Sequence, residues 1–389
     1  AYTASNLSTV VFMERAAMNV ESEVELVHWD TITETGPHPD IDSQVDAVDR
    51  TAPACIIYTS GTSGKPKGVV LSHGAILCNC AGAYYFLKDL PGFALGKESF
   101  LSFLPLSHSY EHTCGQFLPM AIGAQIYYAE GPDKLVANMN DVSPTIITAV
   151  PRLYEAIRAR IYRGVEQVGG LKERLFLKTV FLGRKDYEHP GSLSFLERLQ
   201  NAVLEKLIRK KVRQNFGGKL KAFVSGGAAL NYEVGVDFLA LGLRILQGYG
   251  QTESAPVVSC NMPHRNKLHT VGPALRGVEV KIAADGEILV RGELVMDGYW
   301  KLPNETAETI RDGWLHTGDI GVLDKDDFIQ ITDRKRDIIV NSGGDNISPA
   351  RVEGMLTAEP EIEQALVHGD KRPHLVGLIV PSQDFADRW

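Results

Sequence analysis

The chain has 389 residues, of which 44% are apolar and 23% are charged, ordinary proportions for a globular protein with core enough for two or three domains. Its formal net charge of −8 argues against a protein whose main task is to bind nucleic acid. The sequence has no apolar stretch long enough to span a bilayer and no signal peptide, so we expect a cytoplasmic protein. The five cysteines have neither disulfide nor zinc-ligand spacing and are expected to be reduced thiols.

The two ends of the sequence look incomplete. The chain begins at Ala1 without an initiator Met and ends on Asp387-Arg388-Trp389, so we expect a piece of a longer protein. Residues 21–50 are acidic, punctuated by Pro and Gly and without clear periodicity, which predicts mainly surface loop.

From residue 54 to about residue 260, strand-like and helix-like segments alternate. The predicted strands are 54–58, 99–104, 124–130, 145–150, 220–225 and 243–247. The predicted helices are 73–87, 112–122, 133–141, 152–162 and 231–241. Such alternation is typical of βαβ units around a mostly parallel sheet, so the predicted fold class is α/β.

The pattern changes near residue 270. Two short apolar segments, 278–282 and 287–291, flank Ala283-Ala284-Asp285-Gly286 and predict a hairpin. Short strands and turns continue to about residue 332, and a helix at 349–357 and strands at 364–368 and 375–380 follow. We therefore expect a large domain over 1–332 that includes a small β-rich subdomain, then the start of a small mobile α+β domain over 333–389.

The most informative segment is Tyr58-Thr-Ser-Gly-Thr-Ser-Gly-Lys-Pro-Lys-Gly68. Its hydroxyl groups and glycine amides can surround an anion, and its two lysines add positive charge. Because an apolar strand precedes it, we expect the loop at the end of a buried parallel strand. A plain surface loop would not need two lysines. A Walker loop requires Gly-x4-Gly-Lys, whereas Gly61 and Gly64 are too close together and Pro66 follows Lys65.

Two further turns after predicted strands suggest a nucleotide site. Residues 246–253 combine Gly248 and Gly250, which permit close backbone approach, with Tyr249, which can stack on a purine, and Glu253, a suitable Mg²⁺ ligand. The alternative is a tight turn that caps a helix. Residues 224–229, Val-Ser-Gly-Gly-Ala-Ala, can pass a base or ribose against bare backbone.

Other polar segments, each taken alone, are weaker evidence for a functional site. Asp319 lies between glycine-bearing turns and could accept ribose hydroxyls, unless it is a surface acid. The charge run 332–337 marks a domain boundary and a possible hinge. His108 is expected to line a pocket rather than to bind a metal. The basic helix 201–213 could contact an anionic membrane or a nucleotide phosphate, although a solvated amphipathic helix is favoured.

Taken in order, these motifs resemble the adenylate-forming superfamily of acyl-CoA synthetases, luciferases and peptide-synthetase adenylation domains. The resemblance runs from about residue 54 to the end through Thr-Ser-Gly-Thr-Ser-Gly-Lys-Pro-Lys-Gly, Gly-Tyr-Gly-Gln-Thr-Glu, Trp-Leu-His-Thr-Gly-Asp and Asp-Arg-Lys-Arg-Asp. Residues 105–111 and 338–349 look most like the long-chain fatty acyl-CoA synthetase branch. The resemblance implies that a carboxylate attacks the α-phosphate of ATP with Mg²⁺ present, and that coenzyme A then displaces AMP.

The resemblance also implies roles for individual residues. The β- and γ-phosphates are expected at Thr59, Ser60, Gly61, Thr62, Ser63, Gly64, Lys65 and Lys67, with Mg²⁺ near Thr59 and Glu253. The adenine pocket is expected at Gly227 and Ala228, and the adenylate at Gln247, Gly248, Tyr249, Gly250 and Thr252. Asp319 and Arg334 are expected to contact the ribose, Arg334 alternatively a phosphate, and Arg336 to form the hinge. His108 and Tyr154 are the expected acyl-substrate residues, Tyr154 as an aromatic gate.

The sequence departs from the family at both ends. The family has a catalytic lysine late in its C-terminal domain, whereas the last lysine here, Lys371, has a different context, and the N-terminal portion is short. We expect the complete gene product to activate a medium- to long-chain fatty acid, and a protein that ends at Trp389 to do so very poorly. Two alternatives stay open: a fatty acyl-AMP ligase that loads a carrier protein, and a catalytically impaired nucleotide-binding homologue.

Overall fold

The computed structural model describes residues 8–13, 24–34, 36, 40–59, 65–131, 134–335, 339–340, 342, 346–357, 359 and 361–387. The chain divides into two compact units, residues 1–49 and 50–389. In the first unit, β1 (Thr9–Phe12) pairs in parallel with β2 (Glu25–His28), and the short helices α1 (Trp29–Thr33) and α2 (Ile41–Asp46) follow. The expectation of mainly surface loop over 21–50 was therefore wrong, because these elements are too short to produce a readable periodicity.

The second unit is built on a six-stranded sheet in the order β10-β9-β8-β7-β5-β6. Its strands are β5 (Ser99–Ser102), β6 (Gln125–Tyr128), β7 (Ile146–Ala149), β8 (Ala222–Ser225), β9 (Ile245–Gly250) and β10 (Val257–Cys260). All neighbours pair in parallel except β10, which runs antiparallel to β9. The predicted α/β class is confirmed, and five of the six predicted strands lie in this sheet.

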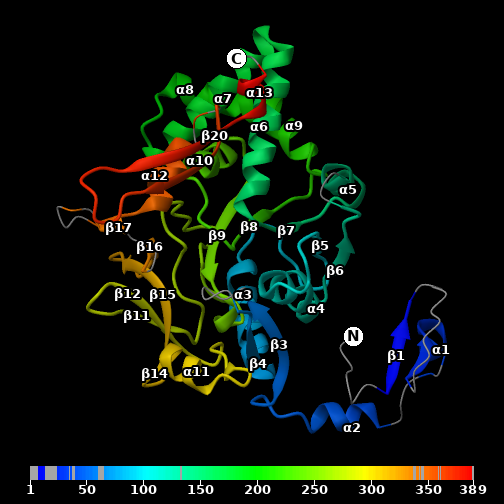
Figure 1. Ribbon diagram of the computed structural model, residues 1–389. Coiled ribbons are helices and arrows are strands. Elements are labelled where there is room, and N and C mark those ends of the chain that lie inside the picture. Colours follow the sequence, from blue (N-terminus) through cyan, green and yellow to red (C-terminus); the bar gives the residue numbers. More distant parts are fainter. Residues whose placement is uncertain are drawn as a thin grey trace. The chain divides into compact units, whose positions relative to one another are not determined.

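Helices cover both faces of this sheet (Figure 1). They are α3 (His73–Leu87), the π-helix η1 (Glu111–Phe117), α4 (Leu118–Ala121), α5 (Leu135–Val142), α6 (Pro151–Val168), α7 (Gly170–Glu188), α8 (Phe195–Leu204), the π-helix η3 (Glu205–Arg209), α9 (Lys210–Gln214) and α10 (Tyr232–Ala240). The predicted helix 112–122 is thus divided into η1 and α4. Within η1 the Glu111 carboxylate occupies the space that a side chain at Gly115 would need.

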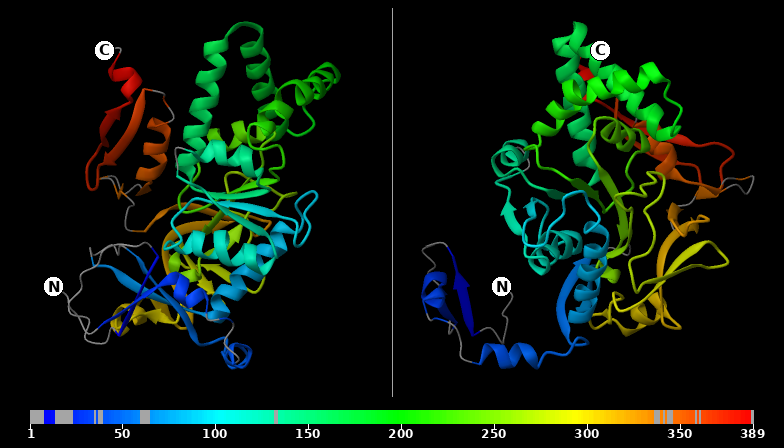
Figure 2. Two further views of the ribbon diagram at one scale, coloured as in Figure 1. Left: turned by 90° about the vertical axis from the view of Figure 1, so that its right-hand side faces the viewer. Right: turned by 180° about the vertical axis from the view of Figure 1, so that it is seen from behind.

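The alternation of side chains along the strands produces two separate cores. One face packs against α5, α6, α7 and α10 through Leu101, Ile147, Phe223 and Ile245. The other face packs against α3 and α4 through Phe100, Ile146, Ala222 and Leu246. Helices α6 to α9 gather at one end of the unit, away from its β-rich part, in all three ribbon views (Figures 1 and 2).

The strand before the Ser/Gly loop was assigned to the wrong sheet. β3 (Pro53–Thr59) pairs antiparallel with β4 (Lys67–Ser72), which also pairs with β13 (Gly298–Tyr299). It is only partly buried, with Tyr58 63% exposed. The expected burial in a parallel sheet fails because the short connection from Thr59 to Lys67 closes a hairpin, whereas a parallel crossover needs roughly a dozen residues.

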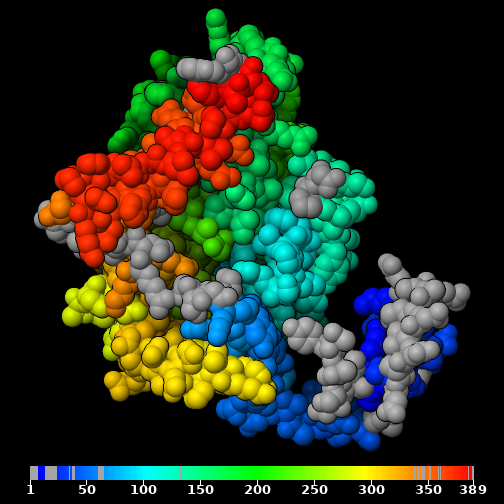
Figure 3. Space-filling view, viewed as in Figure 1, coloured from blue at the N-terminus to red at the C-terminus, as the bar shows by residue number. Residues whose placement is uncertain are grey.

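A second, antiparallel sheet forms the β-rich subdomain. It contains β11 (Glu279–Ile282), β12 (Glu287–Arg291), β15 (Trp314–Leu323) and β14 (Ile310–Arg311), with β16 (Ile329–Arg334) paired to β15. The predicted hairpin is confirmed by the pairing of β11 with β12. The short elements η4 (Thr252–Ser254) and α11 (Pro303–Thr309) complete this region, and α11 borders the β3–β4 hairpin (Figure 3).

The last segment contains β17 (Ile339–Val340), β18 (Asn346–Ile347), α12 (Pro349–Leu356), β19 (Ile362–His368), β20 (Val376–Pro381) and α13 (Gln383–Ala386). β19 and β20 pair antiparallel, so the helix and the two strands expected here are confirmed. The domain boundary near residue 333 stays a prediction. Across the described part of the chain, no helix is long and apolar enough to cross a membrane.

Breaking the buried ion-pair network on α10 should destabilise the helical layer. Asp237 has a side chain only 1% exposed and accepts hydrogen bonds from Arg158 Nε at 2.6 Å and from Tyr162 at 2.9 Å. Asp237→Ala would leave these donors without their acceptor and should lower the free energy of unfolding by about 3 kcal/mol. The matched control, Glu279→Ala, breaks an exposed pair with Arg291 and should change little. Equal effects in urea unfolding would contradict this account.

Candidate functional site

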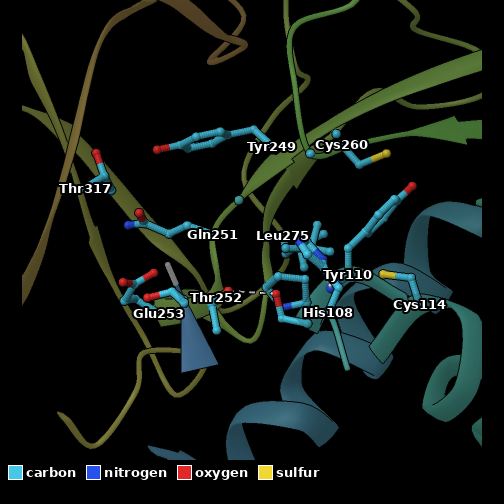
Figure 4. Close-up of a pocket in the computed structure, with 18 of the residues that line it drawn as sticks. His108, Tyr110, Cys114, Tyr249, Gln251, Thr252, Glu253, Cys260, Leu275 and Thr317 are labelled. Carbon is cyan, nitrogen blue, oxygen red and sulfur yellow. Dashed lines mark hydrogen bonds between the residues drawn. The ribbon is translucent and has the colours of Figure 1, made fainter. Parts of the chain in front are cut away.

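A cavity of about 1090 Å³ opens where the carboxyl ends of β8 and β9 meet the β-rich subdomain. Ser225, Gly226 and Gly227 line it after β8, and Gly248, Tyr249 and Gly250 line it at the end of β9. This is the edge at which open α/β sheets bind ligands. The cavity has a polar end and an apolar end, visible in Figure 4 as Glu253, Gln251 and Thr317 on one side and Cys114, Cys260 and Leu275 on the other.

The structure brings most of the predicted site residues together. Those that line the cavity are Thr59, Lys67, His108, Gly227, Gly248, Tyr249, Gly250, Thr252, Glu253 and Arg334. Ser60, Gly61, Thr62, Ser63, Gly64 and Arg336 lie outside the described residues.

Other predicted residues lie elsewhere. Lys65 and Ala228 are exposed and are not among the lining residues. Gln247 is buried, where its Oε1 accepts from Leu230 N and its Nε2 donates to the carbonyls of Leu268 and Thr270. Its role in the structure is to fix two loops behind the strand.

Tyr154 is not placed as a gate to this cavity. It is fully buried, packs edge-on against Phe223 and Phe238, and donates its hydroxyl to Val224 O at 3.1 Å. Tyr110 is among the aromatic residues that do line the cavity, and it donates its hydroxyl to the same carbonyl at 2.8 Å. From the sequence, Tyr110 was visible only as part of the segment around His108.

The polar end joins three segments of the chain. Tyr299, on β13, donates its hydroxyl to Glu253 Oε1 at 2.8 Å, and Lys67 Nζ lies 4.8 Å from the centre of the Tyr299 ring. A cation over an aromatic face is attracted by the ring quadrupole. Sequence reasoning missed Tyr299 because only the pairing of β13 with β4 brings it beside Lys67.

Two oxygen-bearing side chains at this end could hold Mg²⁺. Thr59 supplies a hydroxyl, and Glu253 supplies a carboxylate whose orientation is fixed by Tyr299. Among the described residues, no group of three or more His, Cys, Asp or Glu side chains could hold a metal. Mg²⁺ is typically held by one or two carboxylates together with phosphate oxygens and water.

Asp319 is a buried carboxylate that pairs with both Tyr249 and the exposed Arg334. It accepts from the Tyr249 hydroxyl at 2.7 Å and lies 3.3 Å from Arg334 Nε across the β15–β16 pair. Burial raises the pKa of Asp319, while the Tyr249 hydrogen bond and the Arg334 charge oppose that rise. Asp319 was expected between turns, but it lies within strand β15 and its side chain is only 7% exposed.

Serine and histidine side chains connect the two ends of the cavity. Ser109 Oγ lies 3.0 Å from Thr252 Oγ1, so the segment after β5 is bound to the segment after β9. His108 Nδ1 accepts from the backbone N–H of Tyr110 at 3.2 Å. His108 lies between the polar and apolar ends in Figure 4, as expected for a pocket residue.

The apolar end lies on the α3 face of the large sheet. Its walls are formed by α3, by the central strands and by the η1–α4 segment, through Ala83, Phe86, Leu87, Phe100, Ile146, Leu246, Cys114 and Leu118. Cys114 and Cys260 are free thiols that line this end. Burial raises the pKa of Cys260 to about 12, so these residues behave as small apolar groups rather than as nucleophiles.

A second charged cluster, which sequence reasoning missed, borders the polar end. Glu287 is buried and accepts from Lys335 Nζ at 3.0 Å and from Gly318 N at 2.9 Å, with His316 Nδ1 at 3.1 Å. Burial alone would raise the pKa of Glu287. The hydrogen bonds and charges of these partners lower that pKa by more than burial raises it, so the net pKa is below its ordinary value. Lys335 also pairs with Asp285 at 2.6 Å.

Two family profiles match the chain. The family described as "AMP-binding enzyme" matches residues 5–300, and the one described as "AMP-binding enzyme C-terminal domain" matches residues 336–388.

Curated relatives match over most of this chain. The long-chain-fatty-acid–CoA ligase FadD15 of Mycobacterium bovis is 34% identical over 375 residues, which cover 92% of this chain and 60% of the relative. The peroxisomal long chain acyl-CoA synthetase 6 of Arabidopsis thaliana is 34% identical over 355 residues, which cover 86% of this chain and 49% of the relative. The chain therefore spans about 60% or less of the length of these relatives.

Solved structures share the fold. O-succinylbenzoate coenzyme A synthetase (MenE) from Bacillus subtilis, in complex with ATP and magnesium ion, gives a TM-score of 0.67 at 22% identity over 98% of this chain and 72% of that chain. ATP-bound MatB from Rhodopseudomonas palustris gives a TM-score of 0.67 at 23% identity, and the match covers 93% of this chain and 65% of that chain.

The Glu287 cluster generates a pH-dependent prediction. A carboxylate whose pKa is lowered by folding stabilises the protein at pH values above its ordinary pKa of 4.5. This stabilisation is lost as the pH falls through the folded-state pKa. Lys335→Met should therefore lower the free energy of unfolding by about 1 kcal/mol at neutral pH and by much less at about pH 3. The loss at neutral pH is small because Lys335 is partly exposed and its charge is screened by solvent. Urea unfolding at both pH values measures this. The exposed Lys325→Met is the control, and an equal loss at both pH values would refute the pairing argument.

Proposed function

Because the chain belongs to the AMP-binding enzyme family, we propose that it activates a medium- to long-chain fatty acid. The fatty-acid carboxylate attacks the α-phosphorus of ATP, which forms an acyl-adenylate and releases pyrophosphate. The thiol of coenzyme A then attacks the acyl carbonyl carbon, and AMP leaves. The observation that carries this proposal is the single cavity that has Lys67 and Glu253 at one end and an apolar wall at the other.

The polar end has the charges that a nucleotide requires. Both reactants of the first step are anions, so neutralising the phosphate charge should contribute most to lowering the barrier. Lys67 provides a positive charge at the β- and γ-phosphates, and Thr59 and Glu253 hold Mg²⁺. When bound, this ion neutralises phosphate charge and aligns the leaving pyrophosphate.

The adenosine part of the nucleotide fits the segment at the end of β9. Gly227, Gly248 and Gly250 leave backbone open to the cavity. In this proposal the ring of Tyr249, which lines the cavity, stacks on the base. Asp319, kept in orientation by the Tyr249 hydroxyl and Arg334, accepts the ribose hydroxyls.

The apolar end supports a fatty acid as the carboxylate substrate. Its walls carry aliphatic, aromatic and thiol groups from α3, the sheet and η1–α4, and none of the wall residues Phe86, Leu87, Phe100, Ile146 and Leu118 bears a charge. Burying a hydrocarbon chain there gains about 0.8 kcal/mol per methylene. In this proposal His108, which lies between the two ends, contacts the reacting carboxylate. The names of the relatives from Mycobacterium bovis and Arabidopsis thaliana favour the same substrate class and coenzyme A as the thiol.

Fatty-acid-dependent ATP–pyrophosphate exchange in the complete gene product tests this proposal. Fatty acids of increasing chain length should stimulate exchange, and added coenzyme A should convert the acyl-adenylate to acyl-CoA. Glu253→Gln and Lys67→Gln should each lower exchange by about 100-fold or more, because both side chains act on phosphate charge. Lys325→Gln, at an exposed position of the β-rich subdomain, is the control. Exchange without dependence on a fatty acid, or unchanged by both substitutions, would refute the proposal.

Tyr299 should act as a positioning residue for Glu253 and Lys67. Tyr299→Phe keeps the ring under Lys67 and removes only the hydroxyl, whereas Tyr299→Leu removes both contacts. Losing a hydrogen bond that orients a metal ligand typically costs 10- to 100-fold in metal affinity, so Tyr299→Phe should weaken Mg²⁺-dependent ATP binding by about tenfold. Binding of AMP without Mg²⁺ should be unchanged.

Isothermal titration of ATP at several Mg²⁺ concentrations measures this effect. If Tyr299→Phe binds ATP and Mg²⁺ like the unsubstituted protein, the hydroxyl has no positioning role.

A further inference from the structure

One side of the α8–η3 segment is apolar and open to solvent. Phe195, Leu196, Leu199, Val203 and Leu207 are 80%, 68%, 59%, 48% and 47% exposed. From Leu196 onward they recur every three or four residues, so they fall on one side of a helix. We call these five residues the α8 face. A contiguous exposed apolar stripe usually marks an interaction site, whereas single exposed apolar residues scattered over a surface do not.

The α8 face is not the side by which this segment packs onto its own domain. Leu204 and Val212 are buried and Ile208 packs with the buried cores. Arg209 is also buried and donates its Nε to Ala240 O at 2.6 Å. The segment therefore has a second apolar side in addition to its core side, although a surface helix needs only one.

The free charge around the α8 face is positive. Lys206, Lys210 and Lys211 are exposed. The two acids of the segment are already paired, Glu197 with Lys185 at 2.9 Å and Glu205 with Arg213 at 2.5 Å. A chain with a net charge of −8 thus presents a local cationic, apolar surface.

We propose that the α8 face docks on the surface of an anionic lipid bilayer. Apolar side chains flanked by lysines are the pattern of a helix that lies in the membrane interface. A second copy of this chain is a poorer partner, since a two-fold contact would place the lysines of one face against the same lysines of the other.

The structure also changes the expectation for residues 201–213. This stretch is helical throughout, as the end of α8, then η3 and α9, but it is not fully solvated, because Arg209 is buried and Arg213 is paired with Glu205. The apolar surface begins earlier, at Phe195, the first residue of α8, and α8 lies near the outer edge of the helical layer (Figure 1). The membrane contact expected from the basic residues therefore depends on the leucines and on the three lysines.

Vesicle flotation in the absence of ATP and fatty acid tests the proposal independently of the proposed reaction. The chain should bind vesicles that contain phosphatidylglycerol and bind pure phosphatidylcholine vesicles far more weakly. Leu196→Ser with Leu199→Ser should weaken binding by about tenfold or more, whereas Val322→Ser with Leu323→Ser, exposed on β15, should not. Replacing Lys206, Lys210 and Lys211 by Gln should reduce affinity by about fivefold per lysine, and added salt should do the same.

Two results would overturn the proposal. The first is that the chain does not bind anionic vesicles, or that the α8-face variant (Leu196→Ser with Leu199→Ser) binds them as tightly as the β15 control (Val322→Ser with Leu323→Ser). The other is a dimer, seen by light scattering, that Leu196→Ser with Leu199→Ser converts to a monomer without changing vesicle binding. That result would assign the face to a second copy of the chain.

Discussion

The pairing of β4 with β13 is the contact on which the polar end of the cavity depends. These strands are far apart in sequence, and their antiparallel register places Tyr299 opposite Val69, two residues from Lys67. From there the Tyr299 hydroxyl reaches Glu253, which follows β9. One phenol thus joins the residues that follow the Ser/Gly loop to the segment that follows the large sheet. The pairing thus helps to hold the lysine and the carboxylate at the same end of the cavity.

A second constraint operates at the end of β9. β10 folds back antiparallel so closely that a side chain at Gly250 would collide with the carbonyl oxygen of Pro256. The glycine is therefore required by the protein's own backbone. The two faces of the large sheet have different roles. One face packs against the helical layer that carries the α8 face, and the other face forms the apolar wall of the cavity.

Local patterns predicted what depends on local sequence. Apolar runs identified strands β5 to β9, and the segment 73–87 was found as α3. The same reasoning placed β3 in the wrong sheet, because it did not recognise β4 as a strand and so missed the hairpin. Tyr299 and Glu287 were not found because their roles arise from strand pairing. Tyr154 was assigned by resemblance, but its environment is set by Phe223 and Phe238 from other elements.

The central claim is that the carboxylate of a fatty acid attacks the α-phosphorus of ATP within this cavity. A fatty acid labelled with ¹⁸O in both carboxylate oxygens, incubated with ATP, Mg²⁺ and coenzyme A, tests it directly by mass spectrometry of the products. The account predicts that one ¹⁸O appears in AMP and that pyrophosphate remains unlabelled, because the bridging oxygen of the acyl-adenylate leaves with AMP. Label in inorganic phosphate, or unlabelled AMP formed together with the thioester, would contradict the account.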